Sequence, residues 1–550
     1  MRGYFMAATA QDSEQSPKGG LAYKWKVLIS VIFGIFMVIL DTTVVNVAFR
    51  TVQQDLGATI NEAQWILSIY VLMLGISTPI SGYMADRFGL KRTYVIGLSI
   101  FVLGSFLCGV APTIETLVVA RAIQGLGGGL STPLGTAFIY GAFPPNERGK
   151  ALGVFGIAMV LGPALGPILG GLLVDNDLWR WIFFINVPIG VLGVSLAIRW
   201  LKPTPPTGKP KLDVLGLITS TVGFGSVLYA ATIAAEQGWE SGSVTMWFII
   251  GGISLLLFGL IELFVAKEPL LDLRLFKKPT FTMANLVGWV SVLALFGAEF
   301  LLPLYLQVLR GRTALETGFI LLPLAIAAGF ATPTAGRLYD KIGPRPLIVT
   351  GYAILILNTW QLSKLQADTS IGWIMFLLAL RGLALGMTVQ TTFVTALSDV
   401  DLPKVPRGSA LINATRQVIQ SIGVAVLATI LASTTSVATK EFQEQSQARA
   451  AENAQAGVAT AAFGLCETPG VDPSKNLPAG MEQAPAVMQD QVRSSIQLAC
   501  AEQVAGFEKT YHFTFYVAMV ALFLGLFLPG WPLKWAGRGG TAGAAATASH

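Results

Sequence analysis

Apolar residues in this chain gather into long stretches that short polar segments separate. Each stretch has about 20 residues or more, the length that an α-helix needs to cross the hydrocarbon core of a bilayer. About fourteen such stretches predict an all-α membrane protein, because a spanning helix satisfies its own backbone hydrogen bonds. They lie near residues 25–49, 62–82, 93–111, 114–140, 147–173, 180–200, 212–235, 245–266, 280–307, 314–336, 346–363, 371–397, 406–433 and 511–533.

A charged segment from Gly82 to Arg92 separates the second and third stretches, and a weaker copy runs from Gly336 to Arg345. Such a copy is expected when a transporter consists of two related halves. We predict that both segments are loops at the membrane surface and form a gate. In this gate Asp86 accepts hydrogen bonds from backbone N–H groups or from an arginine at a neighbouring helix end. The residues assigned to the gate are Gly82, Asp86, Arg87, Gly89, Arg92 and Asp340. The alternative is a set of positive anchors without a gating role.

The distribution of positive charge predicts which side each loop faces. If the N-terminus is cytoplasmic, about two thirds of the 37 lysines and arginines lie on the inner side. An even number of spans returns the C-terminus to the same side. We therefore expect a multi-pass protein of the cytoplasmic (inner) membrane with both termini in the cytoplasm.

Composition excludes most other classes of protein. Hydrophobic residues make up 53% of the chain and the mean hydropathy is +0.63, which would expose aggregating surface in a soluble domain. The pI near 9.1 does not indicate a nucleic-acid partner, because the basic residues lie in short loops rather than in one patch. The first apolar stretch is too long for the core of a signal peptide, so we expect it to remain in the protein.

The stretch at 147–173 combines glycines spaced four residues apart with prolines. Glycines at this spacing flatten one helix face, so that another backbone can approach closely, while prolines bend a helix. The residues that carry this pattern are Gly162, Pro163, Gly166, Pro167 and Gly170. Ordinary packing of small residues between helices is the alternative.

Three charged residues stand inside apolar stretches and are candidates for function. Arg121 is costly in a bilayer unless it pairs or faces a cavity, and its candidate partners are Asp41 and Glu299. A carboxylate in a partly dehydrated cavity can bind and release a proton as access alternates. We therefore assign Asp41, Glu299 and Arg121 to proton or cation coupling. The alternative for each carboxylate is an interfacial group near a helix end.

The segment 434–510 is long, polar and predicted to lie outside the membrane. It contains Cys466 and Cys500, which could form a disulfide in an oxidising compartment. Runs rich in alanine and glutamine at 441–462 and 487–508 predict two helices around a proline-rich turn, with a disordered loop as the alternative. Residues 1–20 and 537–550 have the composition of flexible tails.

These motifs resemble the major facilitator superfamily, specifically its fourteen-span drug:proton antiporters of the EmrB/QacA type. The resemblance covers almost every stretch from 25 to 433 and the last one. It rests on the two charged loops, the Gly–Pro pattern and four further segments, namely Leu40–Ala48, Arg121–Gly129, Trp179–Gly190 and Asn413–Gln417, together with Leu302–Gln307. In that family the Gly–Pro pattern marks antiporters rather than symporters.

The resemblance implies a major facilitator fold with fourteen transmembrane helices, in which two six-helix bundles are joined by two inserted helices. The implied parts are an N-terminal tail (1–23), the N-terminal bundle (24–201), the inserted helices (202–278), five helices of the C-terminal bundle (279–433), the extracytoplasmic segment (434–510), the last helix (511–535) and a C-terminal tail (536–550).

We therefore expect an antiporter, not an enzyme, that exports hydrophobic or cationic drug-like compounds in exchange for protons by alternating access. The residues expected to line its substrate cavity are Asn46, Trp65, Gln124, Phe300, Tyr305, Gln307, Gln390 and Asn413. Expected partners are the small substrates, protons, the lipid bilayer and a periplasmic membrane-fusion protein, without nucleic acid. The chain has no phosphate-binding loop, and its two histidines and three cysteines support no metal site, cofactor or catalytic group. Export of lipids or lipid-like metabolites is the alternative, and a membrane sensor or scaffold is a third reading.

Overall fold

The computed structural model describes residues 21–206, 211–366, 368–434 and 486–530. The helices of the first half are α2 (Tyr23–Asp55), α3 (Ile60–Phe88), α4 (Leu90–Val110), α5 (Ile114–Ala142), η1 (Pro145–Glu147), α6 (Arg148–Asp175), α7 (Trp181–Phe184) and α8 (Asn186–Trp200). Two helices follow, α9 (Val214–Gln237) and α10 (Gly242–Leu260), which continues into the π-helical turn η2 (Ile261–Val265). The second half has η3 (Leu273–Lys277), α11 (Pro279–Leu304), η4 (Tyr305–Leu309), α12 (Ala314–Ile342), α13 (Pro344–Leu362), α14 (Ile371–Ser398), η5 (Leu402–Lys404), α15 (Val405–Ala432) and α17 (Ala486–Gly525).

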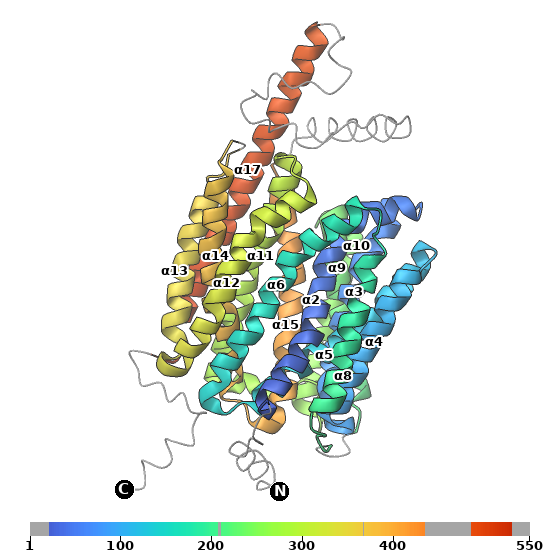
Figure 1. The fold of residues 1–550 in the computed structure, drawn as a ribbon, viewed down its shortest axis with the longest axis vertical. Coiled ribbons are helices and arrows are strands. Elements are labelled where there is room, and N and C mark those ends of the chain that lie inside the picture. The colour runs from blue at the N-terminus through green and yellow to red at the C-terminus, as the bar shows by residue number, and fades with distance from the viewer. Residues whose placement is uncertain (1–20, 207–210, 367, 435–485, 531–550) are drawn as a thin grey trace.

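The helices form two bundles that lie side by side (Figure 1). In the first bundle α2 packs on α6, α8 and α5, while α3 and α4 both pack on α5. In the second bundle α14 packs on α12, α13 and α11, and α17 packs on α11 and α13. The bundles meet where α6 lies against α12 and where α3 and α5 lie against α15. Helix α14 also contacts α6, so the second bundle meets the first through α12, α14 and α15.

Helices α9 and α10 form a pair of their own outside the two bundles. They pack on each other, and α9 also contacts α3 of the first bundle and α15 of the second. The pair thus touches both halves at the helices that face each other.

One end of the molecule holds the start of α2 and the end of α17, and we call it the N-terminal face. Lys24 pairs there with Glu147 at 2.6 Å, at the connection between α5 and α6. The amide of Arg345, at the start of α13, donates to the carbonyl of Pro529 at 3.2 Å, just after α17. The two predicted charged segments lie at this same face.

Helices α3 and α12 repeat one another in local detail. Both have 29 residues, and both begin with a capping box, formed by Thr59 with Glu62 in α3 and by Thr313 with Glu316 in α12. Both end at a single glycine of positive φ, which other residues adopt only with strain. This agreement supports the predicted pair of related halves.

The prediction that the charged segments are loops is wrong for most of their residues. Helix α3 continues to Phe88 and α4 begins at Leu90, so Gly89 alone forms the turn. Gly343 forms the corresponding turn between α12 and α13. The physical reason is that residues such as Ala85 and Asp86 are compatible with a helix, and only the glycine interrupts it.

The glycines of α6 bring it close to two neighbouring helices. Gly162, Gly166 and Gly170 face α2, where the carbonyl of Gly162 accepts from the Thr43 hydroxyl at 3.3 Å. Gly153 instead faces α12, so that a Cβ at this position would lie 2.7 Å from the carbonyl of Thr332. The helix runs through Pro163 and Pro167 without ending. The predicted close approach is therefore present: the glycines spaced four residues apart pack against α2.

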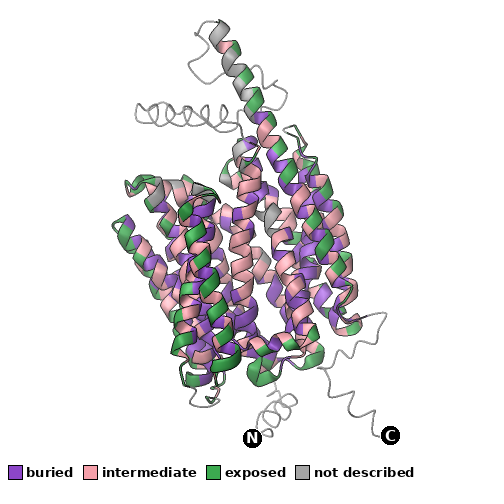
Figure 2. Cartoon of the chain, turned by 180° about the vertical axis from the view of Figure 1, so that it is seen from behind, coloured by how far each residue is buried: buried purple, intermediate pink, exposed green. Residues whose placement is uncertain are grey.

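Exposed positions lie along the outer sides of the helices, and buried positions face between them (Figure 2). Many of the exposed residues are large and apolar. Phe264 and Phe330 are 79% and 75% exposed, which suits lipid and not water. Ten described helices are long and apolar enough to cross a membrane. Each of the predicted stretches contains a helix, but the count of fourteen spans stays a prediction.

Helix α17 runs across residue 510, where the sequence predicts a boundary between an outer segment and the last span. Its 40 residues extend from Ala486 to Gly525, so the predicted helix at 487–508 is continuous with the membrane helix (Figure 1). Alanine, glutamine and glutamate favour helix throughout this region, and no proline interrupts it. The predicted helix at 441–462, Cys466 and the two tails lie outside the described residues. Cys500 is disulfide-bonded, but its pairing with Cys466 stays a prediction.

Contact between α4 and α5 depends on a residue without a side chain at position 127. A Cβ on Gly127 would lie 2.6 Å from the carbonyl of Gly97 and 2.8 Å from the Cα of Phe101. We expect Gly127→Val to lower the free energy of unfolding by roughly 1–3 kcal/mol through overpacking. Thermal unfolding in detergent measures this change. Gly252→Val is the matched control, because no heavy atom lies within 4 Å of a Cβ there; equal loss in both variants would contradict the prediction.

Candidate functional site

A network of polar side chains fills the interior of the first bundle around Asp41. This carboxylate is fully buried in α2 and accepts from three side chains. Its Oδ2 accepts from Arg121 at 2.5 Å, and its Oδ1 accepts from Gln124 at 2.8 Å and from Asn186 at 2.9 Å. The donors come from α5 and α8, so one carboxylate joins three helices.

Arg121 has its other contacts within the same bundle. Its Nε donates to the carbonyl of Ile66 on α3 at 3.0 Å, and its guanidinium lies 4.1 Å from the centroid of the Tyr70 ring. Gln124 accepts from Arg121 at 2.7 Å and donates to the hydroxyl of Ser105 on α4 at 2.7 Å. The network therefore spans α2, α3, α4, α5 and α8. Among the two candidate partners of Arg121, the geometry gives Asp41.

The Asn186 amide leaves one acceptor of this network unused. Its Oδ1 is buried without a hydrogen-bond partner in the described part of the chain, while its Nδ2 donates to Asp41. A rotated amide could accept a hydrogen bond from a protonated Asp41 instead. Sequence analysis did not assign a role to Asn186. The signal for it was an asparagine inside the Trp179–Gly190 segment, next to an apolar run.

Glu299 and Phe300 lie in α11, but their side chains are outside the described part of the structure. Their assignments to coupling and to the cavity stay predictions.

Asp86 joins the two bundles at the N-terminal face. Its Oδ2 accepts from Nε of Arg407 at 2.6 Å, with side-chain exposures of only 10% and 18%. Asp86 is near the end of α3, and Arg407 is in the first turn of α15, on the other half. A charge-assisted hydrogen bond of this kind is stronger than a neutral one. The contact matches the predicted form, an arginine at a neighbouring helix end.

Asp340 makes the reciprocal contact from the second half. Its Oδ1 accepts from the amide of Gly149 at 3.1 Å and its Oδ2 from the amide of Lys150 at 3.2 Å. These amides belong to the first turn of α6, which has no side-chain cap of its own. A carboxylate at this position satisfies free N–H groups and interacts with the positive end of the helix dipole. Asp86 and Asp340 thus each hold the opposite bundle.

The other predicted gate residues have different positions. A Cβ on Gly82 would lie 3.2 Å from Cγ of Arg407, so this glycine leaves room for the arginine. Gly89 forms the turn between α3 and α4, while Arg87 and Arg92 are exposed. Arg407 was absent from the predicted site because its sequence neighbours show only a positive charge at the start of an apolar stretch.

The predicted substrate cavity as a whole stays a prediction, and the described candidates have the following positions. Gln124 belongs to the Asp41 network, and Tyr305 donates from its hydroxyl to the carbonyl of Gln366 at 2.6 Å. Trp65 stacks on Tyr229 of α9, with ring centroids 5.8 Å apart. Of the remaining described candidates, Asn46 is exposed, Gln307 and Asn413 are half-buried and Gln390 is buried.

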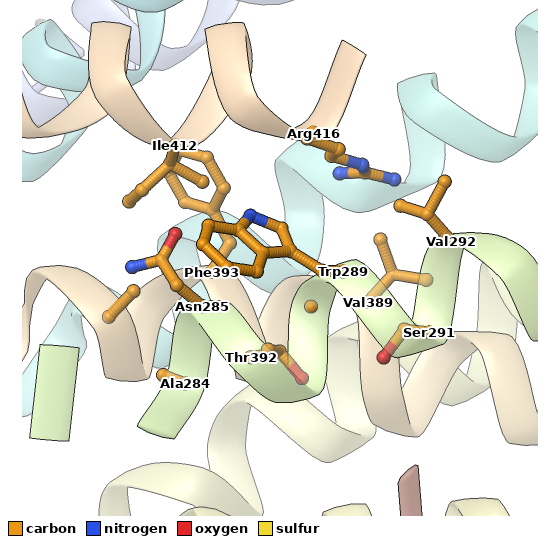
Figure 3. A pocket seen from close by; sticks show the side chains of 12 residues that line it. Ala284, Asn285, Trp289, Ser291, Val292, Val389, Thr392, Phe393, Ile412 and Arg416 are labelled. Atoms are coloured by element: carbon orange, nitrogen blue, oxygen red, sulfur yellow. The ribbon is translucent and has the colours of Figure 1, made fainter. Parts of the chain in front are cut away.

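A pocket lies instead within the second bundle, between α11, α14 and α15 (Figure 3). Trp289 stands at its centre, and its indole N–H donates to the Thr415 hydroxyl at 3.1 Å. Asn285 is 2% exposed, and its Oδ1 has no hydrogen-bond partner among the described residues. The other lining residues are Ala284, Gly288, Ser291, Val292, Val389, Thr392, Phe393, Ala396, Ile412 and Arg416.

This pocket offers aromatic and apolar surface with a few polar groups, as small-molecule sites do. Its volume in this conformation is about 40 Å³, however, so a drug-sized ligand fits only after the surrounding helices have moved apart. No acidic side chain stands among its twelve lining residues, and Arg416 is its one cation. Sequence analysis missed Trp289 and Asn285, because aromatic and amide residues in an apolar stretch give no sign of which face they occupy. Arg416 was visible only as a charge inside the stretch 406–433.

The sequence model of the Major Facilitator Superfamily matches residues 31–424, well over half of the chain. The chain belongs to the major facilitator superfamily. It is accordingly a multi-pass membrane transporter of small substrates, in a superfamily whose members are generally not enzymes.

Similar members of the superfamily include bacterial resistance proteins. The Lincomycin resistance protein LmrB of Bacillus subtilis (strain 168) is 33% identical over 422 residues, covering 76% of this chain and 88% of that protein. The Multidrug resistance protein B homolog of Mycobacterium tuberculosis (strain ATCC 25618 / H37Rv) is 33% identical over 399 residues, covering 71% and 73%. The crystal structure of the human organic anion transporter MFSD10 (TETRAN) has a TM-score of 0.57 at 12% identity, covering 93% of this chain and all of that one, and shows the shared fold.

Loss of the Asp86–Arg407 contact should loosen the N-terminal face of this superfamily member. In a Ser409→Cys background, we expect Asp86→Asn to raise the rate of thiol labelling at position 409 by roughly tenfold, because a charge-assisted hydrogen bond contributes about 1.5 kcal/mol. Ser409 is fully buried and donates to the carbonyl of Pro133 on α5 at 3.0 Å, so labelling reports separation of α15 from α5.

The matched control for this labelling experiment is Asp55→Asn. Asp55 accepts from the Trp179 indole at 3.0 Å within the first bundle, at the end of α2 away from the N-terminal face. Its replacement should leave labelling at position 409 unchanged. An unchanged rate in Asp86→Asn would show that the ion pair does not hold the two bundles together.

Proposed function

We propose that this transporter is a proton-coupled antiporter that exports hydrophobic drug-like compounds across the cytoplasmic membrane by alternating access. The observation that carries the proposal is the buried Asp41 carboxylate in the first bundle, which pairs with Arg121 and accepts from two further side chains. The two bundles are in turn joined by carboxylates at the N-terminal face. Each part of the proposal has its own support.

Proton coupling follows from competition for one carboxylate. A proton and Arg121 cannot both neutralise Asp41, so protonation removes the partner of a buried arginine. The arginine then has to find new contacts, which changes the packing of α2 against α5. Asn186 can stabilise the protonated form through its free Oδ1. A change of charge at Asp41 is thereby linked to a change of helix contacts.

Alternating access follows from the contacts at the N-terminal face. Tyr140 of α5 donates from its hydroxyl to the carbonyl of Leu397 on α14 at 2.7 Å, in addition to the Asp86 and Asp340 contacts. These bonds all cross between the bundles, so the face is closed in this conformation. Opening it requires the bundles to rock apart there, which would admit a substrate from that side.

The N-terminal face is cytoplasmic in this proposal. Positive side chains at this face include Arg87, Lys91, Lys150 and Lys404, as the positive-inside rule expects. The complete fold then has fourteen spans, with α9 and α10 as the inserted pair of the EmrB/QacA type. The far end of α17, which extends beyond the bundle, is the surface for a periplasmic membrane-fusion protein (Figure 1).

The substrate is a hydrophobic compound that contacts Trp289 and Phe393 once movement of α11, α14 and α15 has widened the pocket. The relatives named for lincomycin and multidrug resistance support a drug rather than a lipid as the cargo. The pocket supports hydrophobic character but no preference for cations, since its charged residue is Arg416. Transport in inside-out vesicles under an imposed pH gradient decides between an uncharged drug, a cationic dye and a phospholipid.

Replacement of the Asp41 carboxylate should uncouple transport from the proton gradient. We expect Asp41→Asn to lose gradient-driven accumulation of drug in inside-out vesicles, to below roughly a tenth of the wild-type level, because it cannot carry the proton. It should also lose about 3–5 kcal/mol of stability, since Arg121 remains buried without its partner.

The double variant Asp41→Asn/Arg121→Gln separates these two effects. It removes both charges, so we expect thermal stability in detergent to recover while accumulation stays low. Wild-type accumulation in the double variant would show that the pair is structural and that coupling lies elsewhere, for example at Glu299.

Removal of the indole from the pocket should weaken substrate binding without abolishing coupling. We expect Trp289→Ala to raise the apparent KM for a hydrophobic drug by roughly tenfold, because an aromatic contact contributes about 1.5 kcal/mol. Trp373→Ala is the control, since Trp373 is 44% exposed on the outer surface of α14. Equal KM values for the two variants would exclude the pocket as a substrate site.

A further inference from the structure

The turn η2, which continues α10, contains a buried carboxylate next to exposed apolar side chains. Glu262 lies in the π-helical turn η2 and is fully buried, whereas its neighbours Phe264 and Val265 are 79% and 64% exposed. A π-helical turn changes the direction of the side chains that follow it and is frequent at functional sites. Sequence analysis included Glu262 in the stretch 245–266 but gave it no role.

Only one oxygen of Glu262 has a hydrogen-bond partner in the described residues. Its Oε1 accepts from the amide of Leu270 at 3.0 Å, the Leu271 amide also interacts with this carboxyl, and its Oε2 is buried without a partner among the described residues. A glutamine would accept the same bond without a charge. A buried carboxylate with a free oxygen is costly when ionised and unpaired, so a structural role alone does not account for the acid.

A second carboxylate lies beside Glu262. Asp213 caps α9 by accepting from the amide of Gly216 at 2.9 Å through Oδ1, and its Oδ2 is buried without a partner in the described chain. A Cβ on Gly216 would contact Asp213 Oδ2 and would lie 3.2 Å from Glu262 Oε1. The two acids are therefore close neighbours, each with an oxygen free to share a proton.

The start of α15 lies beside the segment that follows η2, since a Cβ on Gly408, next to Arg407, would lie 3.4 Å from Cδ1 of Leu275. The charges that act on Glu262 from its neighbours are the negative one of Asp213 and, more weakly, the positive one of Arg407. Asp272 lies on the next segment but pairs with Lys404 at 2.8 Å. Of the other charged side chains on the segments around η2, Lys278 is half-buried and donates to the carbonyl of Asp399, and the rest are exposed, namely Lys211, Lys267, Glu268, Arg274 and Lys277. Since Arg407 binds Asp86, its charge acts on two carboxylates from different parts of the molecule.

We propose that Glu262 is a proton-binding site that couples the inserted pair α9–α10 to the Asp86–Arg407 contact. With a proton bound, Glu262 is neutral and Arg407 stays fully with Asp86, so the N-terminal face remains closed. Loss of the proton adds a negative charge beside Arg407, which weakens the hold of Asp86 and favours opening. The closed population therefore falls as the pH at this face rises. The pH response of the N-terminal face is independent of the cargo. It can be absent in a transporter that exports drugs, and present in one that does not.

The test measures the distance between spin labels at Phe88→Cys and Leu402→Cys, which are exposed positions at the end of α3 and just before α15. In the otherwise wild-type transporter in lipid nanodiscs, we expect the population with a long distance to grow from acidic to alkaline pH. In Glu262→Gln, which keeps the acceptor for Leu270, we expect this pH response to be lost and the short distance to remain. A wild-type pH response in Glu262→Gln, or no response in the wild type, would overturn the proposal.

Three further variants make the outcome specific. Glu268→Gln changes an exposed carboxylate of the same connection and should keep the wild-type response. Asp86→Asn should enlarge the population with the long distance at every pH, which verifies that the labels report the contact. Asp213→Asn keeps a good helix cap but removes the neighbouring charge, so the midpoint of the transition should move to lower pH. An unmoved midpoint would contradict a proton shared between Asp213 and Glu262.

Discussion

A charge inside a membrane protein must find its partner within the protein, because lipid offers none. This constraint accounts for the Asp41 network, in which one carboxylate accepts from three donors on two other helices. Each buried charge therefore fixes the relative position of several helices. Moving one of them requires that its charge be neutralised or paired again, which gives a proton a means to change the structure.

Close approach of the helices is the second condition for such a network. The distance from α5 to α4 is short because Gly127 has no side chain, and α6 approaches α2 and α12 through glycines on two of its sides. Small residues at these contacts place the polar groups within hydrogen-bond distance. Apolar contact stabilises each bundle internally, whereas much of the polar contact between the bundles gathers at the N-terminal face. The molecule thus consists of two well-packed bundles. The hydrogen bonds and ion pair between them can be exchanged for hydrogen bonds to water or for protonation of the carboxylates.

Much of the fold could be predicted from hydrophobic stretches alone, because the length of a bilayer sets the length of a helix. Asp41 was recognisable as one of two candidate partners of Arg121, since a charge in an apolar stretch needs a partner, but only the structure selects it over Glu299. The partner of Asp86 was predicted only as backbone N–H groups or an arginine at a helix end. Arg407 itself was not identified, because it is 321 residues away in the chain. The two charged segments were predicted to be loops because their charges were taken as a sign that the helix had ended, whereas α3 and α12 continue through most of them. The pocket around Trp289 and the inward turn of Glu262 depend on helix rotation, which composition does not encode.

The cap that Asp340 provides for α6 has a consequence for biosynthesis. The acceptor and the amide of Gly149 are 191 residues apart, so the first turn of α6 enters the membrane long before its cap has been translated. A missing cap leaves a helix end weaker by about 1 kcal/mol. Until α12 is inserted, this end of α6 must rely on water or lipid headgroups. The first turn of α6 therefore receives its protein cap only after the ribosome has translated α12, in the second half of the chain.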